Sequence, residues 1–304
     1  MIPSFLLKKI RRDKWNENEE HFRQKNLSYE VDEKKDLNYM DDGNALHNLD
    51  LYGPKGSAEI LPVVVQIHGG GYISCDKFID EAQGKFFATQ GFRAANINYS
   101  LQPEKDFIGV MQEIFCALRW IEEHAQKYFL DARQIFVYGE SAGAHYAMLA
   151  GAIQNNRELS AYYGIRPLEK GIRGVAVSCP MYEIHSIREK KDLASRFLRN
   201  ILLPGDKRKD EAYAEHVSIP TVADKGGFPE IFLLTTPTDS LLYQEARQLH
   251  EILEEKKIPH QYREYTSKER CLGHVFHATD PEFPESEEAN KDILDFFREK
   301  GHPF

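Results

Sequence analysis

Short apolar runs alternate along the chain with longer segments in which apolar residues recur every three or four positions. Solid β-branched runs are typical of strands buried on both faces, and the longer spacing is typical of amphipathic helices. The expected strands are 63–67, 92–97, 135–138, 175–177, 231–234 and 260–265. The expected helices are 107–121, 142–152, 242–253 and 289–297. This alternation predicts an α/β fold, with a mostly parallel sheet covered by helices on both faces.

Two polar segments interrupt the pattern. Residues 1–40 are charge-rich with scattered aromatic side chains, and we expect them to form one or two helices laid against the body of the protein. Residues 180–220 contain a charged, helix-like stretch at 187–199, and we expect an insertion over the end of the sheet. The prediction is a single domain over residues 1–304, in which these two segments form a small cap.

Composition limits the classes of function. The 304 residues include 39 Lys and Arg against 48 Asp and Glu, a formal charge of −9, which argues against nucleic-acid binding because that needs clustered basic residues. No apolar run approaches the ~20 residues of a membrane helix, and the N-terminal residues lack the pattern of a signal peptide. The four cysteines are far apart and lack metal-ligand spacing. We therefore expect free thiols, a cytoplasmic protein, and no metal, membrane or nucleic-acid partner.

A G-x-S-x-G pentapeptide occupies residues 139–143, directly between an expected strand and an expected helix. On such a tight turn the serine, Ser141, is forced outward, and the flanking glycines remove the Cβ atoms that would clash. The helix that follows directs its N-terminal N–H groups toward the same point. Ser141 is therefore the candidate nucleophile. The alternative is a glycine turn with a capping serine.

A glycine run, His68-Gly-Gly-Gly71, follows another expected strand. Such a loop can turn its backbone N–H groups toward a ligand, and an HGGG element of this kind can supply part of an oxyanion hole. Loops after neighbouring parallel strands meet at one edge of the sheet, where ligands bind. We expect this loop to lie beside Ser141. The alternative is a flexible glycine loop.

A serine hydrolase of this fold class needs an acid and then a histidine later in the chain. Asp239 follows the strand at 231–234 and precedes a helix, which places it at the active edge, although it could also be a helix N-cap. Asp224 is a weaker rival because no clear strand precedes it. Asp239 is the predicted acid.

The base is expected after the last strand and before the last helix. His274 lies there and is the predicted base, with His277 as the second choice. His250 and His260 lie in or beside regular elements, so their expected role is structural. The last strand, 260–265, could be an exposed edge, and we expect that a homodimer would form there.

Four stretches in this order resemble the hormone-sensitive-lipase-like branch of the α/β-hydrolase esterases: 68–71, 98–104, 117–121 and 139–143. The chain has Glu140 where that branch has an aspartate, and Ala144 where it has a last glycine. The resemblance implies an eight-stranded, mostly parallel sheet and a triad of Ser141, Asp239 and His274. It also implies oxyanion donors from the backbone N–H groups of Gly70, Gly71 and Ala142, with no metal and no organic cofactor.

The predicted function is carboxylesterase activity on a small-molecule ester, through an acyl-enzyme on Ser141. The charged insertion at 180–220 has no large apolar face, so we expect short acyl groups, from acetyl to butyryl. Acetylated-sugar or feruloyl esterase activity is an alternative within the same chemistry. Cleavage of a peptide or amide bond by the same triad is another, as is a non-catalytic small-molecule receptor built on a hydrolase fold.

Overall fold

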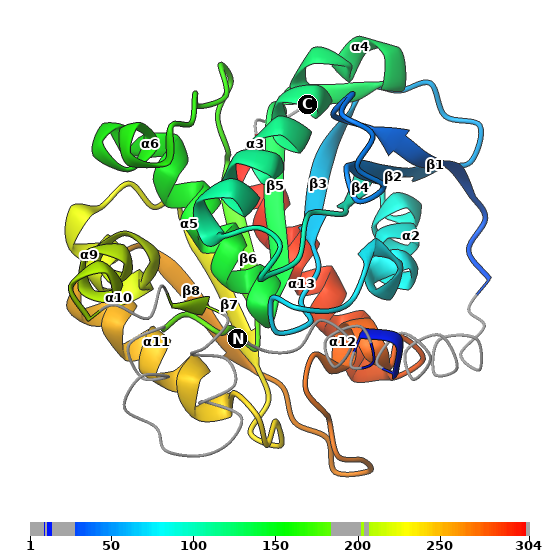
Figure 1. Cartoon of the computed structure of the whole chain (residues 1–304). Helices are drawn as coiled ribbons and strands as arrows, with labels where there is room; N and C mark the ends of the chain where they lie inside the picture. The colour runs from blue at the N-terminus through cyan, green and yellow to red at the C-terminus, as the bar shows by residue number, and fades with distance from the viewer. Residues whose placement is uncertain (1–8, 10, 14–27, 184–201, 204–206, 302–304) are drawn as a thin grey trace.

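Eight strands form one sheet through the middle of the molecule (Figure 1). The computed structural model describes residues 9, 11–13, 28–183, 202–203 and 207–301. The strands are β1 (Val31–Asn38), β2 (Asn48–Pro54), β3 (Leu61–Ile67), β4 (Arg93–Ile97), β5 (Leu130–Glu140), β6 (Gly174–Ser178), β7 (Ile231–Thr235) and β8 (His260–Glu264). Their order across the sheet is β1-β2-β4-β3-β5-β6-β7-β8.

The sheet is mostly parallel. All pairs from β4 to β8 run parallel, whereas β1 pairs antiparallel with β2, and β2 pairs antiparallel with β4. The predicted α/β class and the eight strands implied by the resemblance are therefore confirmed. In the register of β3 and β5, Ile67 lies opposite Gly139, which brings the two predicted active-site loops out at the same edge.

Helices connect the strands and cover both faces of the sheet. They are η1 (Lys77–Asp80), α2 (Glu81–Thr89), α3 (Phe107–Glu123), α4 (Ala125–Tyr128), α5 (Ala142–Asn155), α6 (Arg157–Tyr163), α9 (Lys207–Val217), α10 (Ile219–Lys225), α11 (Tyr243–Glu255), α12 (Phe276–Thr279) and α13 (Pro284–Lys300). Within the described residues, no helix combines the length and the apolar character needed to cross a bilayer.

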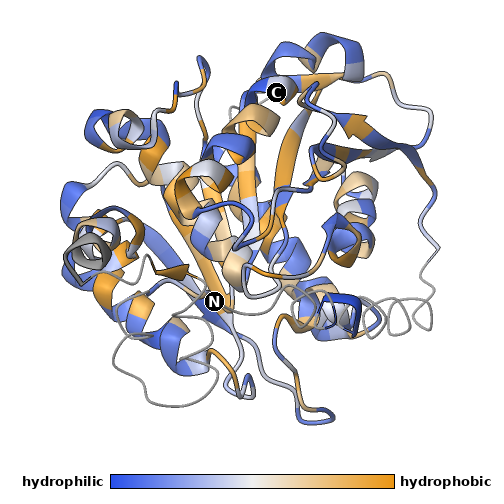
Figure 2. Cartoon of the chain, viewed as in Figure 1, coloured by the Kyte–Doolittle hydropathy of each residue, from blue (hydrophilic) through white to orange (hydrophobic). Residues whose placement is uncertain are grey.

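Each face of the sheet has its own hydrophobic core. Successive side chains of a strand point to opposite faces, so Val63 and Val65 enter one core and Val64 enters the other. The first core lies under α3, α5 and α11, and the second under α2, α12 and α13. Figure 2 shows the central strands as hydrophobic and the outer helix surfaces as hydrophilic. Burial on both faces explains why the strand sequences are solid apolar runs.

The helical prediction for residues 1–40 is wrong where β1 lies. Residues 31–38 form an edge strand whose middle residues are exposed, so its charged sequence carries no apolar period. Its strand conformation comes from pairing with β2, which its own sequence does not reveal. Residues 11–13 are helical, and the charged stretch 187–199 lies outside the described residues.

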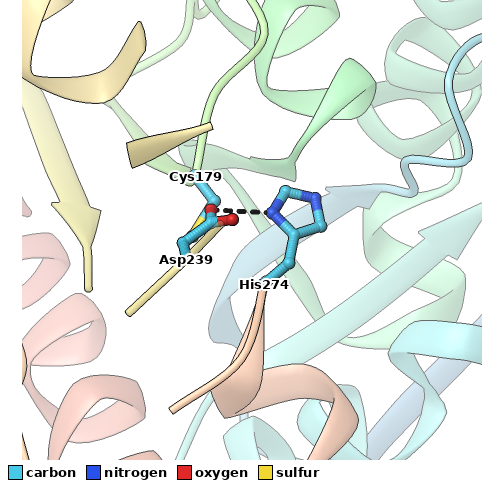
Figure 3. A group of neighbouring side chains, drawn as sticks. All are labelled: Cys179, Asp239 and His274. Atoms are coloured by element: carbon cyan, nitrogen blue, oxygen red, sulfur yellow. Dashed lines mark hydrogen bonds and ion pairs between the residues drawn. The ribbon is translucent and has the colours of Figure 1, made fainter. Parts of the chain in front are cut away.

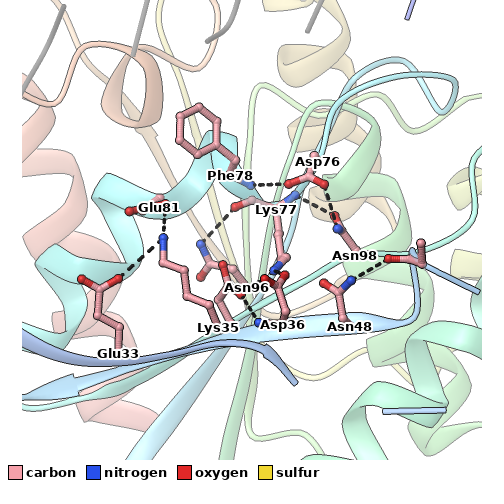
Figure 4. Close-up of polar contacts among 12 residues, drawn as sticks. Glu33, Lys35, Asp36, Asn48, Asp76, Lys77, Phe78, Glu81, Asn96 and Asn98 are labelled. Atoms are coloured by element: carbon pink, nitrogen blue, oxygen red, sulfur yellow. Dashed lines mark hydrogen bonds and ion pairs between the residues drawn. The ribbon is translucent and has the colours of Figure 1, made fainter. Parts of the chain in front are cut away.

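A buried ion pair joins β1 and β2 to the segment that follows the glycine loop. Lys77 is only 6% exposed, and its Nζ donates to Asp36 at 2.6 Å and also to Asp50 (Figure 4). Asp76 accepts from the N–H of Phe78 at 3.0 Å and from the side-chain amide of Asn98 at 2.8 Å. These contacts anchor the chain just beyond residues 68–71 to the sheet, which limits how far the loop can move.

Candidate active site

Ser141 lies between β5 and α5 in a conformation that L-residues rarely adopt. Its φ is 55° and its ψ is −117°. The Ser141 N–H donates to the carbonyl of Ser178 at 2.9 Å, and the Ser141 carbonyl accepts from the N–H of Met181 at 3.0 Å. The end of β6 and the chain that follows it thus hold the strained turn in place on both sides. Strain that is held in this way is a feature of active sites.

The turn requires glycine at position 143. A Cβ on Gly143 would lie 2.0 Å from the carbonyl oxygen of Ile67, the last residue of β3. Because that oxygen is backbone, no side-chain rotation could relieve the clash. Gly143 therefore lets α5 start directly against the end of β3, where the loop of residues 68–71 begins.

The loop of residues 68–71 is fixed to the serine turn by Glu140. The Glu140 carboxylate accepts a hydrogen bond from the N–H of Gly69. Gly70 has a φ of 100° and Gly71 has a φ of 60°, both in the region that favours glycine. In the described part of the chain, no acceptor takes the backbone N–H groups of Gly70 and Gly71. The loop therefore presents two N–H donors beside the turn that carries Ser141.

Asp239 and His274 form a hydrogen-bonded pair at this edge. The Nδ1–H of His274 donates to Oδ2 of Asp239 at 2.8 Å (Figure 3). Oδ1 of Asp239 accepts from the N–H groups of Leu241 at 2.8 Å and Leu242 at 3.1 Å. The Asp239 side chain is fully buried, and that of His274 is 21% exposed. The carboxylate is thus fixed on both oxygens, and it holds the imidazole in the tautomer whose Nε2 can accept a proton.

Electrostatics in the pair favour the ionised forms. Burial raises the pKa of Asp239, but the His274 imidazole and the two backbone donors outweigh it and lower the pKa below its usual value. Burial lowers the pKa of His274, whereas Asp239 and the Cys179 sulfur raise it, with a net rise to about 10. Among the causes that raise the pKa of His274, the hydrogen bond with Asp239 is the largest.

Cys179 is a residue of this site that the sequence analysis did not assign. It lies directly after β6, is fully buried, and has a φ of 43°. Its Sγ and the donor atoms of Asp239 and His274 all lie within 4.8 Å of one another (Figure 3). The three could hold a soft cation, although Asp239 and His274 already satisfy each other. The available signal was the position of Cys179 at the carboxyl end of an expected strand.

Two buried carboxyl groups lie behind the glycine loop. Burial raises the pKa of Glu140, while His274 and the Gly69 N–H act in the opposite direction. Burial and the Glu140 charge raise the pKa of Asp80 well above its usual value. Both Asp80 oxygens are buried without a hydrogen-bond partner in the described residues. Burial thus raises the pKa of both groups, and Glu140 is the one of the two that binds the loop.

The rival residues lie elsewhere. His277 is fully buried and its Nε2 accepts from the hydroxyl of Tyr138 at 2.7 Å, so this ring faces the second core. Asp224 is paired with Lys256 at 2.5 Å on an exposed surface. Of the predicted residues, the structure pairs Asp239 with His274. The charge of His274 also acts to lower the pKa of Glu140, the residue before Ser141.

Comparisons with known proteins find relatives among esterases. The carboxylesterase NlhH of Mycobacterium tuberculosis is 26% identical over 200 residues, which cover 63% of this chain and 60% of NlhH. Human hormone-sensitive lipase is 27% identical over 145 residues, which cover 46% of this chain and 13% of the lipase. The match thus spans less than two thirds of either relative. The resemblance to hormone-sensitive-lipase-like esterases is confirmed.

Solved structures share the fold over nearly the whole chain. Esterase B from Lactobacillus rhamnosis superposes with a TM-score of 0.89 at 24% identity, covering 97% of this chain and 93% of that one. The carboxylesterase EstE1 from a metagenomic library has a TM-score of 0.75 at 19% identity, covering 98% of each chain. The fold is therefore that of the α/β-hydrolase esterases. The family model BD-FAE matches residues 49–253, more than half of the sequence, and the chain belongs to that family.

Proposed function

We propose that this protein is a serine carboxylesterase that works through an acyl-enzyme on Ser141. The observation that carries the proposal is the buried Asp239–His274 hydrogen bond of 2.8 Å at the sheet edge where the strained Ser141 turn lies. Membership of the BD-FAE family and the esterase relatives support it. A strained serine turn alone would also suit a binding protein, but a receptor has no need of a carboxylate that orients an imidazole.

In the proposed mechanism, His274 Nε2 takes the Ser141 proton as the serine oxygen attacks the ester carbonyl. Asp239 holds the tautomer and stabilises the imidazolium. The imidazolium then gives its proton to the departing alcohol, which leaves the acyl-serine. Water repeats the attack with His274 as base, and the acid departs as Ser141 regains its proton.

The oxyanion of each tetrahedral intermediate needs hydrogen-bond donors. We assign this role to the backbone N–H groups of Gly70, Gly71 and Ala142. Each such donor contributes on the order of 3 kcal/mol to transition-state stabilisation. The Glu140–Gly69 hydrogen bond supports the assignment, because it fixes the first turn of the glycine loop against the serine turn.

Replacing the nucleophile tests the proposal. Ser141→Ala should reduce hydrolysis of p-nitrophenyl acetate to background, while circular dichroism and thermal unfolding show a folded protein. A fluorophosphonate probe should label the wild-type protein and not the variant. Retained turnover in a clean Ser141→Ala preparation would exclude the acyl-enzyme mechanism.

The proposed substrates are esters of short acids, from acetyl to butyryl, with acetylated-sugar and feruloyl esters as the alternatives. A series of p-nitrophenyl esters, acetylated xylo-oligosaccharides and feruloyl esters, each with the Ser141→Ala control, separates these classes. A maximum at about eight carbons or longer would contradict the short-chain assignment. An aminoacyl anilide in the same panel tests for amide cleavage.

The organisation of the chain is also part of the proposal. We propose one catalytic domain with a cap made from residues 1–40 and 180–220, and no cofactor. The contacts of Arg11 support the cap. Its guanidinium donates to the carbonyls of Ile73 at 2.7 Å and Gln102 at 2.8 Å, next to the glycine loop. The four free cysteines fit a reducing cytoplasm. β8 is the last strand of the sheet order, so its open side is where we propose that a homodimer forms.

A further inference from the structure

Away from the active site, two histidine rings contact each other edge to face between α11 and β8. His250 lies in α11, and Glu254 follows it by one helical turn, so both side chains share one helix face. His260 is the first residue of β8. The donor atoms of these three residues all lie within 4.8 Å of one another.

The hydrogen bonds fix how the two rings are protonated. Nδ1 of His260 is 2.8 Å from the carbonyl oxygen of Ile258, which can only accept, so Nδ1 carries a proton. The Nε2 of neutral His260 therefore has a free lone pair, directed at Nδ1 of His250 at 2.8 Å. In metal sites, a histidine that binds the metal through one ring nitrogen usually donates its other ring N–H to a carbonyl or carboxylate oxygen.

The ring positions are held by packing. The His260 side chain is only 4% exposed. His250 stacks on Tyr262, with ring centres 4.3 Å apart and an angle of 12° between the planes. Glu254 is 68% exposed, and its Oε1 is 3.7 Å from Nε2 of His260. Packing therefore fixes the positions of two ring nitrogens, and an exposed carboxylate lies at the open side.

We propose that His250, Glu254 and His260 form a binding site for a divalent cation of the zinc class. Two nitrogens bound to a tetrahedral zinc at ~2.0–2.1 Å lie roughly 3.3–3.4 Å apart. The rings would therefore separate by only about half an ångström from their present distance. The Nδ1 proton of His250 moves to Nε2 of the same ring, Glu254 supplies the oxygen ligand and a negative charge, and water completes the coordination.

The position of the site gives it a structural role. His260 pairs with Ile231 at the start of β7, whereas Asp239 follows the end of that strand. The cation would therefore lie at the opposite edge of the sheet from the catalytic residues. There it would join the end of α11 to the start of β8, stabilising the outermost strand without entering the ester chemistry.

Zinc binding to the full chain tests the proposal. After dialysis against a chelator and then buffer, calorimetric titration with ZnCl₂ should show one equivalent bound, and the cation should raise the melting temperature by several degrees. His250→Gln and His260→Gln should each abolish this binding, and Glu254→Gln should weaken it about tenfold. The matched control is His216→Gln in α9, which should bind zinc as the wild type does.

Cobalt(II) spectra and activity assays distinguish binding at this site from binding at the Cys179–Asp239–His274 cluster. Cobalt(II) at the proposed site should show visible absorption without a thiolate charge-transfer band, and the protein should keep its esterase activity. His250→Gln without metal should hydrolyse p-nitrophenyl acetate like the wild type. Zinc binding that survives in both histidine variants, or no binding by the wild type at 100-fold excess of zinc, would overturn the proposal.

Discussion

At the scale of single residues, the site depends on a few backbone and side-chain contacts that hold reactive groups in unfavourable states. Ser141 keeps a positive φ because its N–H is bonded to the last residue of β6 and its carbonyl to the chain that follows. Asp239 stays ionised in a buried position because three donors surround it. For Ser141 these partners, and for Asp239 the imidazole of His274, lie far away along the sequence.

Asp239→Asn should lower activity and move the pH profile in a defined direction. The profile of kcat/KM against pH reports the pKa of the free base. Because Asp239 raises the pKa of His274, the imidazole gains its proton at a higher pH than an ordinary histidine, so the acid limb of the wild type lies above about pH 6.5. Removing the carboxylate charge should shift this limb to lower pH. The rate should fall by roughly 10³–10⁴-fold, because the wrong tautomer forms.

The matched control for this variant is Asp224→Asn. Asp224 is exposed and paired with Lys256, so its replacement should leave both the rate and the acid limb unchanged. Stopped assays of p-nitrophenyl acetate hydrolysis from pH 5 to 10 would measure both quantities (a range chosen around the usual histidine pKa of ~6.5). An unshifted acid limb in Asp239→Asn would show that Asp239 does not act on the base.

At the scale of elements, most strands that the sequence predicts are buried on both faces, and the partly exposed β8 is the exception. β3, β6 and β7 are entirely buried, and their apolar runs stand out from their surroundings. β1 and β2 escape prediction because β1 is an exposed edge and β2 contains Asn48, Asp50, Gly53 and Pro54. Local composition indicates burial, whereas edge pairing is a long-range property. The serine turn was predictable because a strand, a glycine motif and a helix follow one another directly.

Gly143→Ala should destabilise the junction between β3 and α5. The added methyl would lie 2.0 Å from a backbone oxygen that belongs to β3, so the helix or the strand must shift. Overpacking of this kind costs about 1–3 kcal/mol or more. Urea unfolding should show a loss in that range, together with loss of esterase activity as the turn moves.

Gly273→Ala is the comparison for this variant. A Cβ at Gly273 meets nothing within 4 Å, so the unfolding free energy should change by less than ~1 kcal/mol. Equal stabilities of the two alanine variants would contradict the role given to the contact between Gly143 and β3.

At the scale of the whole molecule, strand order brings together residues that are far apart in sequence. Neighbouring β5, β6 and β7 end at one edge, which places Ser141, Cys179 and Asp239 in adjacent loops. The parallel arrangement was predictable, and so was the position of Asp239 directly after β7. Three features were not predictable, because each depends on side-chain packing between separate elements. They are the buried role of Glu140, the position of Cys179, and the contact between the rings of His250 and His260.

Packing at this scale also determines how the protein responds to acid. His277 lies between the sheet and α13 as a neutral, fully buried ring, and burial, aided by the charge of His274, lowers its pKa to about 3. Burial also lowers the pKa of His145, beneath α10, to about 4. In the unfolded chain both titrate near ~6.5. Between these values the unfolded state binds protons that the folded state does not, so stability falls as pH falls.

His277→Gln isolates one of these protons. The pH dependence of wild-type stability sums the contributions of many groups, including Asp80, whose raised pKa acts in the opposite direction. These shared contributions cancel in the difference between the wild type and the variant. From about pH 6 down to pH 4, the unfolding free energy of the wild type should fall more steeply than that of the variant by about 1.4 kcal/mol per pH unit. Urea unfolding at several pH values measures both slopes, and His145→Gln should show a similar difference. Parallel slopes would mean that His277 already carries a proton in the folded state. The Tyr138 contact and the apolar surroundings of the ring oppose that protonation.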